Sequence, residues 1–126
     1  MYKIYQYFLT HKKLTLFAAF LWTIIIIIGC SIPGKDIPKI GLFEHFDKVV
    51  HFTFFAVFFI LWYIYYHTSK QIVFILILIS AIFGFLIEWY QLNFVAGRSF
   101  DVWDGVADTI GALIGALFIY FLNKKK

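Results

Sequence analysis

Four long apolar runs, separated by short polar connections, dominate the pattern of this chain. They cover about residues 14–32, 49–66, 71–92 and 102–122. A helix needs roughly 20 residues to cross the hydrocarbon core of a bilayer, whereas a tilted barrel strand needs only about 10. The run lengths therefore predict an all-α fold, a polytopic membrane protein built as a bundle of four transmembrane helices. We expect one domain over residues 1–126, with the aromatic segment 2–10 lying at the membrane interface or extending the first helix.

The distribution of Lys and Arg predicts how these helices are oriented. With the N-terminus inside, seven lysines fall on the inner side, and three lysines and Arg98 fall on the outer side. Short cytoplasmic loops carry an excess of Lys and Arg. We therefore expect both termini in the cytoplasm and the connections 33–46 and 93–100 on the opposite face of the membrane.

The composition supports a membrane protein and excludes some functions. The chain is 63% hydrophobic and 14% charged, whereas soluble domains carry about 25% charged residues. The net charge of +4 comes largely from lysines beside the apolar runs, so it indicates membrane anchoring and not nucleic-acid binding. A single cysteine, Cys30, excludes an internal disulfide.

Cys30 also raises a second interpretation of the first helix. The sequence Ile27-Ile28-Gly29-Cys30 fits a bacterial lipobox, which would be cleaved before Cys30 and lipidated there. We favour a retained helix that ends in small residues, because three further spans already anchor the chain and no A-x-A-type cleavage site is visible.

Nine polar residues gather at the predicted outer ends of the last three runs. They are Asp47, Lys48, His51, Glu88, Gln91, Arg98, Asp101, Asp104 and Asp108. A charged side chain at the centre of a membrane helix costs about 2.5–3.5 kcal/mol on insertion scales. The convergence of five acids on one end of so small a protein therefore marks the candidate functional site.

Helical spacing places these residues on one stripe of each helix. The stripe of the fourth run steps by three or four residues through Asp101, Asp104, Asp108, Gly111 and Gly115. The stripe of the third run holds Ser80, Gly84, Glu88 and Gln91, and that of the second holds Asp47, His51, Phe54 and Phe58. The two glycines of the fourth run form a GxxxG pattern, which we interpret as helix packing.

Two structural explanations compete with a functional site. Asp47 and Asp101 stand where helices start, so they could serve as N-terminal caps. A network of charges could also simply hold the helix ends together. Capping explains Asp104 poorly, and it does not explain Glu88 or Asp108.

The same polar residues resemble the VanZ-like family of small bacterial membrane proteins. The similarity runs from about residue 33 to 121 and rests on Asp47-Lys48-x-x-His51-Phe52, Glu88-x-x-Gln91, Arg98-x-x-Asp101, Asp104-x-x-x-Asp108-Thr109-x-Gly111 and Gly115. The family often has Asn where this chain has Asp108, so the site is more acidic here. The resemblance implies a role in the cell envelope of a bacterium, in its cytoplasmic membrane, and the family's namesake is associated with resistance to teicoplanin-type glycopeptide antibiotics.

The residue types suggest a division of chemical roles. His51 and the carboxylates Glu88, Asp104 and Asp108 are candidates for acid and base work. The remaining candidates would bind a substrate, with Arg98 suited to a phosphate; they are Lys48, Gln91, Arg98, Asp101 and Asp47. Carboxylates with one histidine also suit Mg²⁺ or Mn²⁺, but no compact ligand motif is present, so the metal and any cofactor stay unknown.

Three classes of function remain open. The first is a binder of an envelope lipid or of the anionic headgroup of a lipid-linked cell-wall precursor. The second is a membrane enzyme that performs acid/base chemistry on such a lipid. The third, an ion- or proton-coupled carrier, is least favoured because the polar residues do not continue to the inner ends of the helices. The sequence leaves the oligomeric state open.

Overall fold

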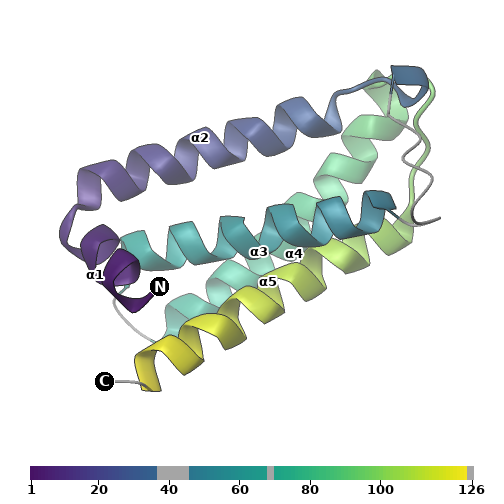
Figure 1. Ribbon diagram of the computed structural model, residues 1–126. Helices are drawn as coiled ribbons and strands as arrows, with labels where there is room; N and C mark the ends of the chain where they lie inside the picture. Colours follow the sequence, from purple (N-terminus) through teal and green to yellow (C-terminus); the bar gives the residue numbers. More distant parts are fainter. Residues whose placement is uncertain (37–45, 68–69, 125–126) are drawn as a thin grey trace.

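The computed structural model describes residues 1–36, 46–67 and 70–124 and is built from helices (Figure 1). Four of them are long and apolar enough to cross a membrane, which confirms the predicted all-α bundle. The helices are α1 (Tyr2–Thr10), α2 (Lys12–Cys30), η1 (Gly34–Asp36), α3 (Phe46–Tyr66), α4 (Lys70–Phe94) and α5 (Val102–Lys124). Pro38 and the lysines at 39, 125 and 126 lie outside the described residues.

Both termini lie at one end of the bundle, which we call the terminal end (Figure 1). α2 and α4 run away from this end, and α3 and α5 run back toward it. The opposite end holds the start of α3, the end of α4 and the start of α5, and we call it the polar end. All nine polar candidates belong to segments at the polar end, as the alternating helix directions require.

The aromatic segment at the N-terminus forms its own helix and does not extend α2. The chain turns at His11, and α1 folds against α3 at the terminal end. Tyr5 is buried there and donates a hydrogen bond from Oη to Asn123 Oδ1 at 2.8 Å. Burial raises the pKa of the Tyr5 hydroxyl. The Tyr5–Asn123 hydrogen bond ties the first helix to the end of α5.

The closest helix pair is α3 and α5, and two glycines set its spacing. A Cβ atom on Gly111 would collide with the carbonyl oxygen of Phe52, and one on Gly115 would lie 2.8 Å from the carbonyl oxygen of Ala56. Both glycines are buried. The GxxxG pattern thus works as expected, because it lets the α5 backbone approach the α3 backbone directly.

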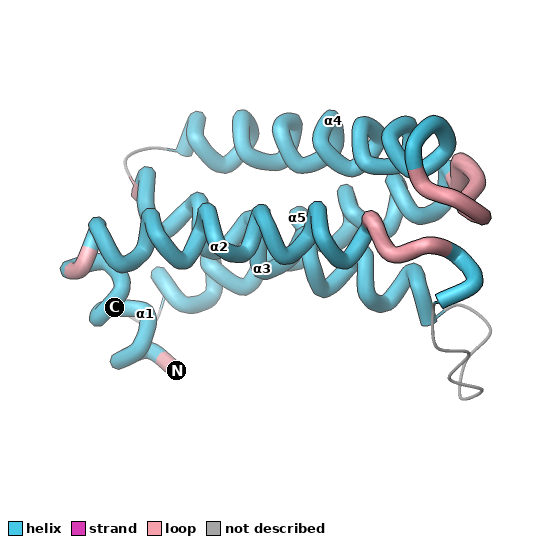
Figure 2. Tube along the Cα trace, turned by 90° about the horizontal axis from the view of Figure 1, so that it is seen from above, coloured by secondary structure: helices cyan, strands magenta, loops and turns pink. Residues whose placement is uncertain are grey.

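Helices α2 and α4 meet only near the polar end. There Gln91 Nε2 donates to the carbonyl oxygen of Cys30 at 3.0 Å, and the hydroxyls of Ser31 and Tyr90 are 3.0 Å apart. Toward the terminal end the two helices diverge (Figure 1), although they run side by side when seen from above (Figure 2). Their separation leaves an apolar space beside α3.

Candidate functional site

Lys48, in the first turn of α3, is surrounded by carboxylates. Its Nζ lies 2.7 Å from Asp101 Oδ2, 2.8 Å from Asp104 Oδ1 and 3.7 Å from Asp47 Oδ2. These contacts connect the start of α3 to the start of α5. The ammonium group of Lys48 is therefore already committed to protein carboxylates.

One turn further along α3, His51 faces three acids from two other helices. Its Nδ1 lies 3.0 Å from Asp108 Oδ1 and 4.0 Å from Glu88 Oε1. Its Nε2 lies 4.0 Å from Asp104 Oδ2. We call these four residues, His51, Glu88, Asp104 and Asp108, the buried cluster. The four are the residues that the sequence suggested for acid and base work.

The buried cluster is closed to solvent in this structure. The exposed fractions are 2% for His51, 0% for Glu88, 4% for Asp104 and 0% for Asp108. Two carboxylate oxygens in it, Glu88 Oε1 and Asp108 Oδ2, are buried and have no hydrogen-bond partner among the described residues. Buried polar atoms are normally satisfied, so these two call for an explanation.

A glycine on α4 makes the approach of Asp108 possible. A Cβ atom on Gly84 would lie 2.7 Å from Asp108 Oδ2 and 2.8 Å from Asp108 Cβ, distances that real atoms do not adopt. Ser80, one turn before Gly84, donates its hydroxyl to the carbonyl oxygen of Leu76 at 2.7 Å. The small residues Ser80 and Gly84 of α4 thus leave space for Asp108 of α5, and neither contributes a polar side-chain contact to the buried cluster.

Asp101 combines capping with charge pairing. Its Oδ1 accepts a hydrogen bond from the Trp103 N–H at 2.8 Å, as an N-terminal cap does. The hydrogen bond from Lys48 is the main reason why the pKa of the Asp101 carboxyl lies below its ordinary value. The Asp101 backbone N–H in turn donates to Glu88 Oε2 at 2.9 Å, which fixes α4 to the start of α5. Asp47 shows no such cap among the described contacts; its carboxylate lies beside Lys48.

Gln91 and Arg98 occupy the polar end without joining the buried cluster. Gln91 is buried and binds the Cys30 carbonyl, so it serves the α2–α4 contact. Arg98 lies on the connection between α4 and α5, and its Nε is buried without a hydrogen-bond partner. Among the described residues, Arg98 forms no ion pair although six acids lie at the same end.

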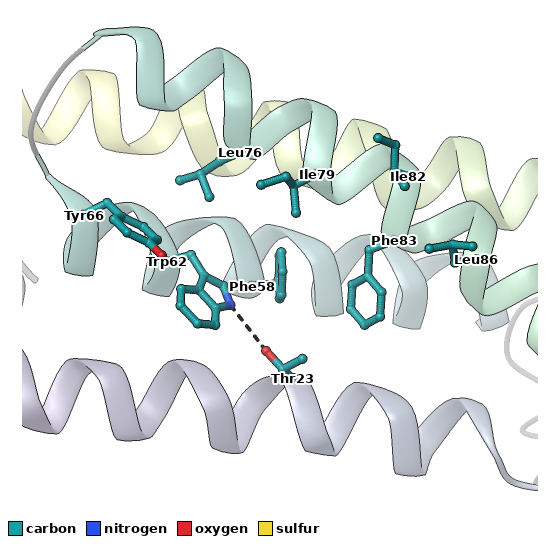
Figure 3. A pocket seen from close by; sticks show the side chains of 9 residues that line it. All are labelled: Thr23, Phe58, Trp62, Tyr66, Leu76, Ile79, Ile82, Phe83 and Leu86. Carbon is teal, nitrogen blue, oxygen red and sulfur yellow. Dashed lines mark hydrogen bonds between the residues drawn. The ribbon is translucent and has the colours of Figure 1, made fainter.

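An apolar groove, which was not predicted from the sequence, lies between α2 and α4 with α3 as its floor (Figure 3). Its volume is about 440 Å³. Trp62 crosses toward α2 and donates from Nε1 to Thr23 Oγ1 at 3.3 Å. The groove is lined by Thr23, Phe58, Trp62, Tyr66, Leu76, Ile79, Ile82, Phe83 and Leu86. Sequence reasoning could not find it, because its residues resemble every other apolar residue of the spans.

The fold and the cluster define a small multi-pass membrane protein with a buried acidic site at one end. In a comparison with known families, a sequence model of the family described as VanZ/LLP1 matches residues 3–123. The chain belongs to this family, which confirms the resemblance seen in the sequence. No curated protein and no solved structure matches the chain.

Proposed function

We propose that this VanZ-family protein binds the headgroup of an envelope lipid, or of a lipid-linked cell-wall precursor, at the polar end of its bundle. Arg98 carries the proposal. A guanidinium forms paired hydrogen bonds with a phosphate, and this one has no carboxylate partner among the described residues. Gly34 donates its backbone N–H to Ala96 O at 3.0 Å, which brings η1, with exposed Lys35, close to the loop carrying Arg98.

The apolar groove supports the lipid part of the proposal. Pockets that hold small ligands measure about 300–1,000 Å³ and have mostly apolar linings with a few polar groups. The groove has a volume of about 440 Å³, and the Thr23 hydroxyl and the Trp62 indole N–H are among its few polar groups. A lipid would place an acyl or prenyl chain in the groove beside α3.

The proposal also includes a membrane and an orientation for the protein, which rest on the positions of Lys and Arg along the chain. We assign the protein to the bacterial cytoplasmic membrane with both termini in the cytoplasm, so that the polar end faces the cell wall. The excess of seven inner over four outer Lys and Arg residues supports this orientation. A link to glycopeptide resistance would then act through the exposure of a wall precursor, and the teicoplanin susceptibility of cells with and without the protein measures it.

Direct binding tests the headgroup assignment. The purified protein in nanodiscs should bind phosphatidylglycerol or a polyprenyl phosphate in preference to phosphatidylcholine, as measured by native mass spectrometry. Arg98→Ala should weaken this preference at least about tenfold, which corresponds to about 1.4 kcal/mol. Lys12→Ala removes a charge at the terminal end and serves as the control. Equal phosphate-lipid binding by Arg98→Ala and the wild type would refute the assignment.

The contact between His51 and Asp108 favours a second candidate, a membrane enzyme that acts on the same lipids. A histidine oriented by a buried carboxylate is a common arrangement for a general acid or base. The ring nitrogen and the carboxylate oxygen are 3.0 Å apart, and both residues are buried. Lipid extracts of cells that express the wild type or His51→Gln, compared by mass spectrometry, test this candidate. A product that appears only with the wild type would support it, and identical lipid profiles would contradict it.

A further inference from the structure

We propose that His51, Glu88 and Asp104 bind one divalent transition-metal ion between α3, α4 and α5. One ring nitrogen of His51, one oxygen of Glu88 and one oxygen of Asp104 all lie within 4.8 Å of one another. With metal–ligand bonds of about 2.0–2.2 Å, three ligands spaced evenly around one ion lie no more than about 3.8 Å apart. A contraction of up to about 1 Å in the distances between the ligand atoms would therefore complete the set. This inference goes beyond headgroup binding and does not depend on it.

A buried carboxylate oxygen of Glu88 without a hydrogen-bond partner also supports a cation at this point. Glu88 is 0% exposed, and its Oε1, which lies 4.0 Å from His51 Nδ1, has no hydrogen-bond partner among the described residues. Its other oxygen accepts a hydrogen bond from the Asp101 N–H at 2.9 Å. An ionised oxygen that is buried without a donor costs free energy, and a cation at this point would remove that cost.

Asp108 is placed to orient the histidine. Its Oδ1 lies 3.0 Å from His51 Nδ1; in the tautomer with the proton on Nδ1, the carboxylate accepts this hydrogen bond and Nε2 is the nitrogen able to bind a cation. Nε2 lies 4.0 Å from Asp104 Oδ2, and the Glu88 carboxylate, whose Oε1 lies 4.0 Å from Nδ1, would have to turn toward the Nε2 side to reach the same ion. Histidine ligands of metals usually donate their other ring N–H to a carboxylate in this way. Asp108 would thus be a positioning residue and not a ligand.

The local charge also favours a further cation. Five carboxylates gather here, and Lys48 is the one described lysine or arginine that forms an ion pair with any of them. With neutral His51, four formal negative charges are left, and a divalent ion halves that number. Imidazole with carboxylates favours Zn²⁺ or Mn²⁺ over Ca²⁺ and Mg²⁺, which prefer oxygen ligands alone.

A second group of acids at the same end does not meet these conditions. Asp47, Asp101 and Asp104 also bring ligand atoms within 4.8 Å of one another. The ammonium group of Lys48 contacts all three, and Asp47 and Asp101 are partly exposed. Lys48 already supplies the positive charge at this place, so the proposed ion belongs to the deeper group around His51.

Metal content of the purified full-length protein tests the proposal. After treatment with EDTA and dialysis against Zn²⁺ or Mn²⁺, we expect about one ion per chain by elemental mass spectrometry. Glu88→Gln should abolish this binding, and Asp108→Asn should weaken it by about 10- to 100-fold. Asp36→Asn, an exposed acid at the same end, is the matched control and should bind as the wild type does.

Two further readouts separate a metal site from a purely structural cluster. The electron spin-echo signal of bound Mn²⁺ should contain a nitrogen coupling that disappears in His51→Gln. Circular dichroism should show that Glu88→Gln stays helical. If Glu88→Gln does not fold, Asp108→Asn provides the second test. Absence of stoichiometric Zn²⁺ and Mn²⁺ binding by the wild type, or undiminished binding by folded Glu88→Gln or by Asp108→Asn, would overturn the proposal.

Discussion

His51 and Asp108 form a buried pair whose energetic coupling can be measured. Removing either member leaves the other buried without its partner, which is costly inside a membrane bundle. In a double-mutant cycle of His51→Ala and Asp108→Ala, we expect a coupling free energy of about 0.5–3 kcal/mol from unfolding in detergent.

The control for this cycle pairs His51→Ala with Asp36→Ala. Asp36 is exposed and shares no side-chain contact with His51 among the described residues, so these two changes should add to within about 0.5 kcal/mol. Full additivity of His51→Ala and Asp108→Ala would mean that the 3.0 Å contact contributes nothing to stability.

At single positions, burial was easier to predict from the sequence than the contact partners of the buried residues. A carboxylate in the middle of an apolar run, such as Asp108 or Glu88, must turn inward, so its burial could be expected. The partners come from other helices, and their pairing depends on how deeply each helix is set. Gln91 therefore fitted the polar stripe but binds the Cys30 carbonyl, and Lys48 suited a substrate but contacts protein acids.

At the start of α5, a substitution can separate the capping role of Asp101 from the effect of its charge. Asn caps a helix as well as Asp does, so Asp101→Asn should keep the cap and lose only the ion pair with Lys48. Because the pKa of Asp101 is lowered in the folded protein, the stabilisation by its charge is complete above its ordinary pKa of about 3.9 and is lost as the pH falls through the lower folded-state value.

We therefore expect Asp101→Asn to have a lower Tm than the wild type at neutral pH, and the difference to shrink once the pH falls below about 3.9. Thermal unfolding in detergent, followed by circular dichroism across this range, measures both effects. A difference in Tm that is the same at neutral and strongly acidic pH would show that the Asp101 charge does not stabilise the fold.

The contact between α3 and α5 depends on a backbone approach that only glycine permits. Gly111→Ala would drive a Cβ atom into the Phe52 carbonyl, and overpacking of this kind costs about 1–3 kcal/mol. Gly29→Ala is the matched control, because its Cβ would meet only the edge of the Phe54 ring at 3.1 Å. Denaturation in detergent should show a clear loss for the first variant and little for the second. Equal stabilities would contradict the role of Gly111.

Among the elements, length and apolar content were enough to predict the four spans. The observed helices begin and end within about four residues of the expected bounds, because the bilayer thickness dictates the length of each run. The sequence did not decide whether residues 2–10 would form a separate helix, as α1 does, or extend the next one. Its turn at His11 and its contact between Tyr5 and Asn123 depend on where the end of α5 lies.

The apolar groove belongs to the scale of the whole molecule. It exists because α2 and α4 meet at the polar end and diverge beyond it, with Trp62 bridging to Thr23 across the space. Every lining residue is an ordinary component of a membrane helix, so no pattern along the chain marks the groove. Only the arrangement of three helices creates it.

The placement of both termini at one end makes the orientation of the whole protein testable. The terminal end carries Lys12 and Lys13, and lysines gather on the cytoplasmic side, so we expect the polar end to face outward. The experiment uses a Cys30→Ala background with a new cysteine at either end. A membrane-impermeant thiol reagent should label Lys35→Cys in intact cells, and it should label Lys124→Cys only after the membrane is permeabilised. Labelling of Lys124→Cys in intact cells, with Lys35→Cys protected, would reverse the orientation. The site would then face the cytoplasm, where a lipid-linked wall precursor is assembled and not where it is used.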